Sequence, residues 1–313
     1  MNEIKEISSD IYNKIWQILI DSLLQIDYKE RLDINQVIKF LEDELNNKGS
    51  MENLGNKMNR MNLSNKNNII KGEIYIKKEN INKYIQIINS FENYKREQWV
   101  DEDVDLKCSN EKEIKENIEI KINGKLIEFT YYYQFNKEGT YIIEYSFKNN
   151  LTKTCYMFCH CDRLISLDLS NFNTQNVNNK RSMFYDCNSL TNLDLSNFNT
   201  QNVNNMNMMF YDCYSLISLD LSNFNTQNVT NMRRMFYEYN SLISLDLSNF
   251  NTQYVIDMSY MFYECNSLIS LDLSNFNTQN VTNMYNIFYD CNSIKKENII
   301  TKNDEILKEF ANK

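Results

Sequence analysis

The chain has 313 residues, enough for one to three domains with buried cores, and it contains no proline and only five glycines. Its formal net charge is −9, with acidic and basic residues mixed. It has no basic stripe with interleaved aromatic residues, which argues against a nucleic-acid-binding protein. No run approaches the ~18 apolar residues of a membrane span, so we expect no membrane-spanning segment.

The sequence begins with the charged stretch MNEIKEISSDIYNKIW, which lacks the apolar run of a signal peptide. As written, the protein is therefore expected in the cytoplasm. If the gene product continues upstream of Met1 with a signal peptide, we expect the cell surface instead.

Residues 1–45 have a helical pattern, and residues 46–70 are a polar linker. Within residues 10–45, the segment LIDSLLQIDYKERLDINQVIKFLEDEL resembles the C-terminal end of a protein-kinase C-lobe; a generic helical hairpin is the alternative. The resemblance implies that Arg31 matches the family's buried Arg. Its Ala-Pro-Glu partner is absent, as are the Gly-rich loop, His-Arg-Asp and Asp-Phe-Gly. The segment therefore cannot transfer phosphate.

Residues 71–150 are predicted to form a small antiparallel β domain. They contain β-branched and aromatic runs separated by Asn, Lys and Gly turns. Ile118, Ile120 and Ile122 alternate with polar residues, as in a half-buried strand, and Asn123-Gly124 is a hairpin turn signal. Because the ends of repeat arrays need covering, we expect this domain to cap the repeats that follow.

Residues 151–294 are dominated by a 26-residue repeat. Five full units follow the half unit YMFCHCDR and begin at Leu164, Leu190, Leu216, Leu242 and Leu268. Self-similarity at a fixed period of this length is the signature of a stacked repeat architecture.

Each unit is predicted to contain one short strand and one short helix. In the third unit, Leu219 and Leu221 alternate around Asp220, which favours a strand. A second group of apolar residues then recurs at a spacing of three to four, which favours a helix. This group precedes the start of the next unit and consists of Val229, Met232, Met235 and Phe236. The predicted fold class is an α/β repeat solenoid, preceded by the β domain and the helical segment. Residues 295–313 are a charged tail or a capping helix from about Asp304.

The repeat resembles a known family. Phe184-x-x-Cys187-x-x-Leu190-x-x-Leu193-x-Leu195 is similar to the core pattern of BspA-type leucine-rich repeats, and the resemblance covers residues 155–294. Three positions depart from it: Lys180 and Ile287 stand in Met columns, and Tyr239 stands in the Cys column. The resemblance implies a non-catalytic binding module that presents an extended surface to a protein or surface ligand.

The cysteines are interpreted as reduced structural thiols. Cys161, Cys187, Cys213, Cys265 and Cys291 occupy one column of the repeat, as expected for packing positions. The only histidine, His160, lies between Cys159 and Cys161. No CxxC pair accompanies it, and sequence identifies no third orienting group, so we predict neither a metal site, a cofactor nor Cys–His catalysis.

Two sets of repeated side chains are candidate functional residues. The first is an outward-facing ladder, interpreted as a solvated acidic stripe, with a Ca²⁺ or polar-ligand track as the alternative; it consists of Asp168, Asp194, Asp220, Asp246 and Asp272. The second set lies between the Met columns, where the units differ most. Its Arg and Tyr side chains are candidate binding anchors, and the alternative is sequence drift on a solvated face. The set consists of Arg181, Arg233, Arg234, Tyr260 and Tyr285. The Asn residues of SNFNTQN are expected to satisfy backbone groups.

No catalytic triad, phosphate-binding loop or metal set is present in the sequence, so we predict that the protein is not an enzyme. The leading function is a leucine-rich-repeat binding module for a protein or surface ligand. The alternative is a regulatory or truncated remnant of a kinase–repeat fusion whose catalytic part is absent from this chain. The sequence specifies neither the ligand nor the oligomeric state.

Overall fold

The computed structural model describes residues 68–97 and 108–311. These belong to one compact unit, Asn67–Lys313. The predicted helical segment 1–45 with Arg31, and the linker as far as residue 67, lie outside the described residues.

The described part of residues 68–150, here called the cap, consists mainly of β-strands. Four cap strands, in the order β4-β3-β6-β1, form a six-stranded sheet with β7 (Leu164–Asp168) and β8 (Asn192–Asp194) of the repeats, and β2 and β5 form a separate pair. Ile118, Ile120 and Ile122 are buried, as their alternation predicts, and the Asn123-Gly124 hairpin is confirmed by positive φ angles of 48° and 76°. The elements of the cap are β1 (Ile69–Ile76), η1 (Lys78–Asn80), β2 (Tyr84–Gln86), α4 (Phe91–Glu97), α5 (Glu111–Asn117), β3 (Ile118–Ile122), β4 (Lys125–Ile127), β5 (Tyr132–Gln134) and β6 (Gly139–Phe147).

The cap contains two helices, α4 and α5, that the sequence reading missed. Within the run YIQIINSF, residues 84–91, only β2 is extended, and α4 begins at Phe91. Ser90 explains the change, because its Oγ accepts a hydrogen bond from the Asn93 N–H at 3.1 Å and so caps the first turn of the helix.

The cap is continuous with the repeats through β1. This strand pairs antiparallel with β7 (Leu164–Asp168), the strand of the first unit, with Gly72 opposite Leu167. A Cβ atom at Gly72 would lie 3.1 Å from Leu164 Cδ2 and 3.2 Å from Leu167 Cδ2, so glycine permits this close approach. The backbone groups of the first unit's strand are thereby paired on both sides.

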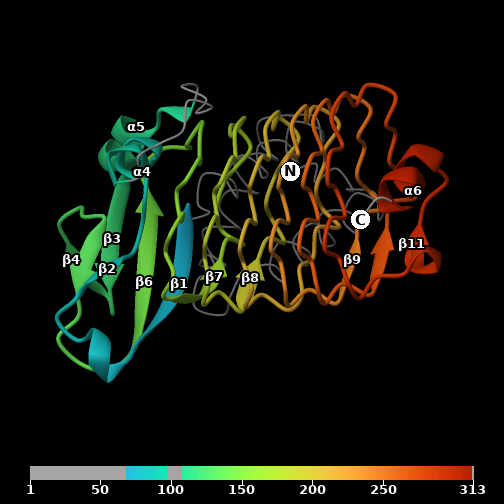
Figure 1. The fold of residues 1–313 in the computed structure, drawn as a ribbon. Helices are drawn as coiled ribbons and strands as arrows, with labels where there is room; N and C mark the ends of the chain where they lie inside the picture. Colours follow the sequence, from blue (N-terminus) through green and yellow to red (C-terminus); the bar gives the residue numbers. More distant parts are fainter. Residues whose placement is uncertain (1–67, 98–107, 312–313) are drawn as a thin grey trace, which may run out of the picture. The chain divides into compact units, whose positions relative to one another are not determined.

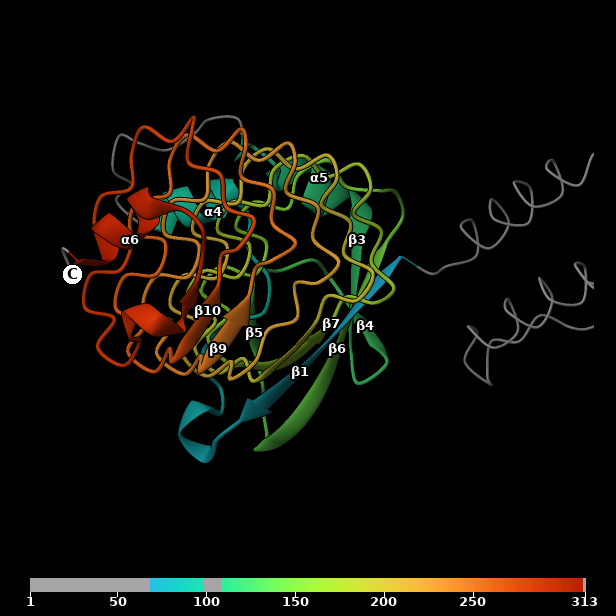
Figure 2. The same cartoon turned by 90° about the vertical axis from the view of Figure 1, so that its right-hand side faces the viewer.

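The repeat units stack as parallel coils. Strands pair with a shift of 26 residues, as at Leu167 with Leu193 and at Leu245 with Leu271. A second ladder on another side of each coil links Lys153, Asn179, Asn205, Asn231, Asp257 and Asn283 in sequence. Along the stack the coils follow nearly the same outline (Figure 2). The strands of the full units after β7 are β8 (Asn192–Asp194), β9 (Ser244–Asp246) and β10 (Ser270–Asp272).

One strand per unit was expected, but the third unit, residues 216–241, has none. The ladder is therefore divided between the six-stranded sheet and a three-stranded sheet of order β11-β10-β9. This unit is flanked by Tyr214 and contains Tyr239, which replace the Asn and Cys found in these columns elsewhere.

The helix predicted in every unit is wrong, because residues 148–295 contain no helix. Two residues four apart in each unit adopt left-handed backbone, as at Ser182 (φ 52°) and Asp186 (φ 58°) in the first unit. Their N–H groups donate to the next coil, to the carbonyls of Asn207 and Tyr211, rather than along a helix. Between them, the Met183 and Tyr185 N–H groups close short turns on the carbonyls of Lys180 and Ser182, respectively.

The core consists of columns of like side chains running through the stack. Phe158, Phe184, Phe210, Phe236, Phe262 and Phe288 form one column, with ring centroids 5.7–6.2 Å apart. Tyr145 of β6 packs on its first ring at 5.4 Å, and Phe310 packs on its last ring at 5.5 Å. Aromatic residues from outside the repeats therefore cover both ends of the column.

The C-terminal end of the stack is covered by three short elements: η3 (Lys296–Asn298), β11 (Ile299–Ile300) and α6 (Asp304–Ala311). A charged tail and a capping helix were the two alternatives for this segment. The structure contains the helix, which begins at Asp304 and buries Ile306 and Phe310. Figure 1 shows the cap strands at one end of the coils and α6 with β11 at the other.

Candidate functional site

The structure brings four of the five candidate anchor residues together. The Arg234 guanidinium carbon lies 5.0 Å from the centre of the Tyr260 ring, and that of Arg233 lies 6.0 Å from it. Tyr285 packs edge-on to Tyr260, with centroids 5.5 Å apart. Arg181 belongs to the first unit, where its carbonyl accepts a hydrogen bond from the Tyr156 N–H. These side chains lie on turns, not on a helix face, and only Tyr285 is largely exposed, at 61%.

A tyrosine ladder that sequence reasoning missed runs beside this cluster. Neighbouring rings stack nearly parallel at centroid distances of 4.5, 4.5, 4.5 and 5.1 Å. Burial raises the pKa of Tyr211 to about 12, so this phenol is protonated at neutral pH. The signal was present in the sequence as an invariant Tyr after the Phe of every full unit. The ladder consists of Tyr185, Tyr211, Tyr237, Tyr263 and Tyr289.

An acidic residue follows each of these tyrosines. Together the ten side chains form what we call the tyrosine–carboxylate ridge. Burial and the neighbouring carboxylates Asp212 and Glu264 raise the pKa of Glu238, and burial and Asp186 raise that of Asp212. The acidic members are Asp186, Asp212, Glu238, Glu264 and Asp290.

The backbone fixes the spacing of the ridge. The N–H groups of Asp212, Glu238 and Glu264 donate to tyrosine carbonyls of the next coil at 2.8–2.9 Å. In the described part of the chain, none of these three carboxylates has an ion-pair partner within 4.0 Å. These three carboxylates are therefore a preorganised row of like charges without a described ion-pair partner, whereas Asp186 at the first coil lies beside His160.

The predicted aspartate ladder has a local structural role. In each member Oδ1 accepts the N–H of the residue two positions later at 2.8–2.9 Å, as Asp220 does from Ser222. Hydrogen bonds from Ser222 and Ser248 lower the pKa of Asp220 and Asp246. These are Asx turns at the strand ends. Within residues 68–97 and 108–311, no group of three or more His, Cys, Asp or Glu side chains is arranged to hold a metal ion.

Adding millimolar Ca²⁺ is therefore expected to leave the melting temperature unchanged, because a cation that bound the folded ladder would raise it. Thermal melts with and without Ca²⁺ measure this. The control is the triple variant Asp194→Asn, Asp220→Asn and Asp246→Asn, which keeps an acceptor oxygen in each turn. A rise in melting temperature that this variant abolishes would establish the cation track.

The asparagines of the repeat act as expected. Asn249 Nδ2 donates to the carbonyls of Leu221 and Phe224 in the preceding coil, at 2.9 and 3.0 Å, and Asn223 bonds equivalently to Leu195. These side chains satisfy backbone carbonyls at the turns.

His160 has a carboxylate partner that the sequence did not reveal. Its Nδ1 lies 2.5 Å from Asp186 Oδ2, one coil away. Cys159 and Cys161 are free and fully buried, and burial raises the pKa of both thiols well above the ordinary value. Since the thiolate is the reactive form, the His160 segment has no available cysteine nucleophile.

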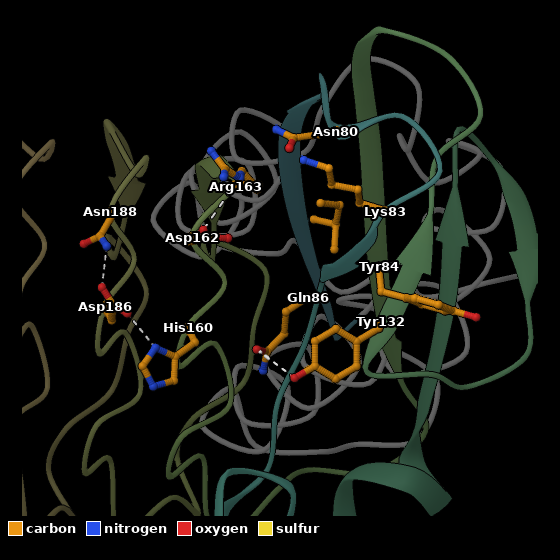
Figure 3. A pocket seen from close by; sticks show the side chains of 11 residues that line it. Asn80, Lys83, Tyr84, Gln86, Tyr132, His160, Asp162, Arg163, Asp186 and Asn188 are labelled. Carbon is orange, nitrogen blue, oxygen red and sulfur yellow. Dashed lines mark hydrogen bonds and ion pairs between the residues drawn. The ribbon is translucent and has the colours of Figure 1, made fainter. Parts of the chain in front are cut away.

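A pocket of about 390 Å³ lies between the cap and the first two coils, and we call it the junction pocket (Figure 3). The cap contributes Asn80, Lys83, Tyr84, Ile85, Gln86 and Tyr132, and the coils contribute His160, Asp162, Arg163, Asp186 and Asn188. Gln86 Nε2 donates to the Cys159 carbonyl at 3.2 Å, which joins the two walls.

Comparison with known proteins identifies a family. The family model described as "Mycoplasma protein of unknown function, DUF285" matches residues 129–241 and 215–308, so the two matches together span more than half of the chain. The chain belongs to this family. Membership is compatible with the BspA-type resemblance and fits a surface-protein-like repeat module. No curated protein and no solved structure matches the chain. Among the described residues, no helix is long and apolar enough to cross a membrane.

Proposed function

We propose that the chain is a non-catalytic binding module of the leucine-rich-repeat type and that its tyrosine–carboxylate ridge is the contact surface. One observation supports this above all: the same tyrosine and carboxylate recur in register on five successive coils. The other features of the coils are explained by packing and by backbone hydrogen bonding, whereas Asp212, Glu238 and Glu264 have no ion-pair partner within 4.0 Å among the described residues.

The ligand class that fits the ridge is a protein with a basic segment. Each carboxylate attracts a Lys or Arg side chain, and the adjoining tyrosine edges and hydroxyls provide amphipathic contact. Carboxylates on adjacent coils repel each other, and this repulsion adds to the effect of burial in raising the pKa of Glu238. A basic chain lying along the ridge removes that repulsion, which favours a ligand with several cationic groups over one with a single charge.

Binding of a lysine decamer at low salt and pH 7, followed by calorimetry, tests this proposal. The triple variant Asp212→Asn, Glu238→Gln and Glu264→Gln is expected to weaken binding by about 10-fold, since exposed ion pairs contribute about 0.2–1 kcal/mol each. Added salt is expected to weaken wild-type binding in the same direction.

The matched control is the strand-face triple Asp194→Asn, Asp220→Asn and Asp246→Asn, which removes the same net charge from another side of the same coils. It is expected to bind the decamer nearly as well as the wild type. Equal weakening by the two triples would show that net charge, rather than the ridge, governs binding, and the proposal would then fail.

A further inference from the structure

The junction pocket differs chemically from every other point of the stack. The acidic column of the ridge continues into the half unit, residues 156–163, and there the carboxylate is replaced by the only histidine of the chain. His160 and Asp186 pair through Nδ1 and Oδ2, and Asp186 Oδ1 also accepts a hydrogen bond from Asn188 Nδ2. The repeat pattern is thus broken at the coil where the cap provides an opposite wall.

The cap wall is fixed by its own hydrogen bonds. Gln86 Nε2 bonds to the Cys159 carbonyl, and Gln86 Oε1 accepts from the Tyr132 hydroxyl at 3.3 Å. The same hydroxyl lies 2.5 Å from Glu97 Oε2. Both polar walls are therefore preorganised, which reduces the entropy lost on binding a small ligand.

The lining selects a class of ligand. Ten of the eleven lining residues carry a polar side-chain group, and the exception, Ile85, is buried. An apolar ligand would displace solvent from these polar groups without replacing its hydrogen bonds, which is unfavourable. Lys83 and Arg163 balance Asp162 and Asp186 in formal charge, so neither a simple anion nor a simple cation matches the lining.

The lining contains both donors and acceptors, and the volume of about 390 Å³ falls within the usual range for small-molecule sites of roughly 300–1,000 Å³. In Figure 3 Lys83 extends from the cap toward the side where Arg163 and Asp162 lie, while His160 and Asp186 lie below them on the coil side. Vicinal hydroxyl groups, which donate and accept at adjacent positions, satisfy such a lining. Tyr84 at the border is 73% exposed, and in Figure 3 its ring points away from the coil wall, so the polar side chains supply the contacts to a ligand.

We propose that the junction pocket binds a neutral sugar ring. Saturation-transfer NMR on the full chain, with D-glucose, D-galactose, D-mannose and N-acetyl-D-glucosamine as separate probes, tests this. At least one sugar is expected to receive saturation from the protein. Two single variants remove one donor side chain each from the pocket: Arg163→Ala on the coil wall and Lys83→Ala on the cap wall. Each is expected to raise the Kd of that sugar about three- to tenfold, the effect of one lost hydrogen bond.

Asn292→Ala serves as the matched control, because Asn292 occupies the repeat position of Asn188 at the far end of the stack. It is expected to leave the Kd unchanged, and melting curves verify that each variant is folded. The proposal is overturned if none of the four sugars receives saturation, or if folded Lys83→Ala and Arg163→Ala bind as the wild type does. It is also overturned if a zwitterion, tested as L-serine, binds this pocket and the sugars do not.

Discussion

Replacing Phe224 with alanine is expected to lower the free energy of unfolding by about 3–5 kcal/mol, the usual cost of deleting a buried phenyl ring. Phe224 is 3% exposed and stacks between Phe198 and Phe250, with centroids 6.0 and 6.3 Å away. The cavity would lie within a column shared by three coils, so neither neighbour can close it without moving its own ring. Urea unfolding followed by circular dichroism measures the change.

Ile217→Ala is the control, because Ile217 lies in the same unit and is 66% exposed. Truncation of this exposed side chain is expected to change stability by less than about 0.5 kcal/mol. If Phe224→Ala unfolds at the same urea concentration as Ile217→Ala, the Phe column is not core and the orientation of every coil would need revision.

The packing of the repeats could be predicted because it depends on columns. A 26-residue period places like residues above one another, so Leu, Phe, Val, Met and Cys columns identify the interior without a model of the turns. All five predicted column cysteines are buried, and the column thiol of Cys213 donates to the Phe184 carbonyl of the preceding coil at 3.0 Å.

The turns could not be predicted because glycine does not mark them. Left-handed backbone is usually signalled by Gly or Asn, but here Met208, Arg234 and Tyr260 adopt it with φ of 55–59°. The resulting pair of tight turns spaces Met and Phe by three to four residues, which is also the spacing of a helix face. Hydrophobic spacing alone does not distinguish the two.

The candidate sites also differ in how far the sequence alone could predict them. The tyrosine–carboxylate ridge was visible as an invariant Tyr column followed by a column of Asp or Glu, and needed only the observation that columns stack in space. The pairing of His160 with Asp186 follows from the same superposition of units. The junction pocket was inaccessible to sequence reasoning, because β2 and β5 belong to the cap, which has no repeat and whose docking on the first coils no pattern predicts.

Lys180 is the departure from the repeat with the clearest energetic consequence. It occupies the column of Met206, Met232 and Met258, is 0% exposed, and has no hydrogen-bond partner for its Nζ among the described residues. That atom lies 3.9 Å from the centre of the Phe198 ring. Burial lowers the pKa of the amine well below its ordinary value, and Cys155 opposes this only in part.

Lys180→Met is therefore expected to raise the free energy of unfolding at pH 7 by about 1–3 kcal/mol, the cost of an unpaired polar group in a protein interior. Methionine restores the residue of the other coils and fills irregular space well. Urea unfolding at equilibrium measures the gain. The exposed-site variant Lys125→Met, which leaves the core unchanged, is expected to stay within about 0.5 kcal/mol of the wild type.

The gain from Lys180→Met is expected to depend on pH. Since the folded-state pKa of Lys180 lies below its ordinary value of 10.5, the unfolded chain binds a proton that the folded chain lacks throughout the interval between the two values. Wild-type stability at this site therefore rises with pH across that interval, by up to about 1.4 kcal/mol per pH unit, and is lowest below the folded-state pKa.

The methionine variant lacks this titration, so its advantage over the wild type is expected to shrink as pH rises toward 10.5. Unfolding curves of both proteins at pH 7, 8, 9 and 10 isolate the effect, because the other titrating groups are common to the two chains. A constant difference across this series would mean that Lys180 titrates alike in both states, and the amine would then have to reach solvent in the folded protein.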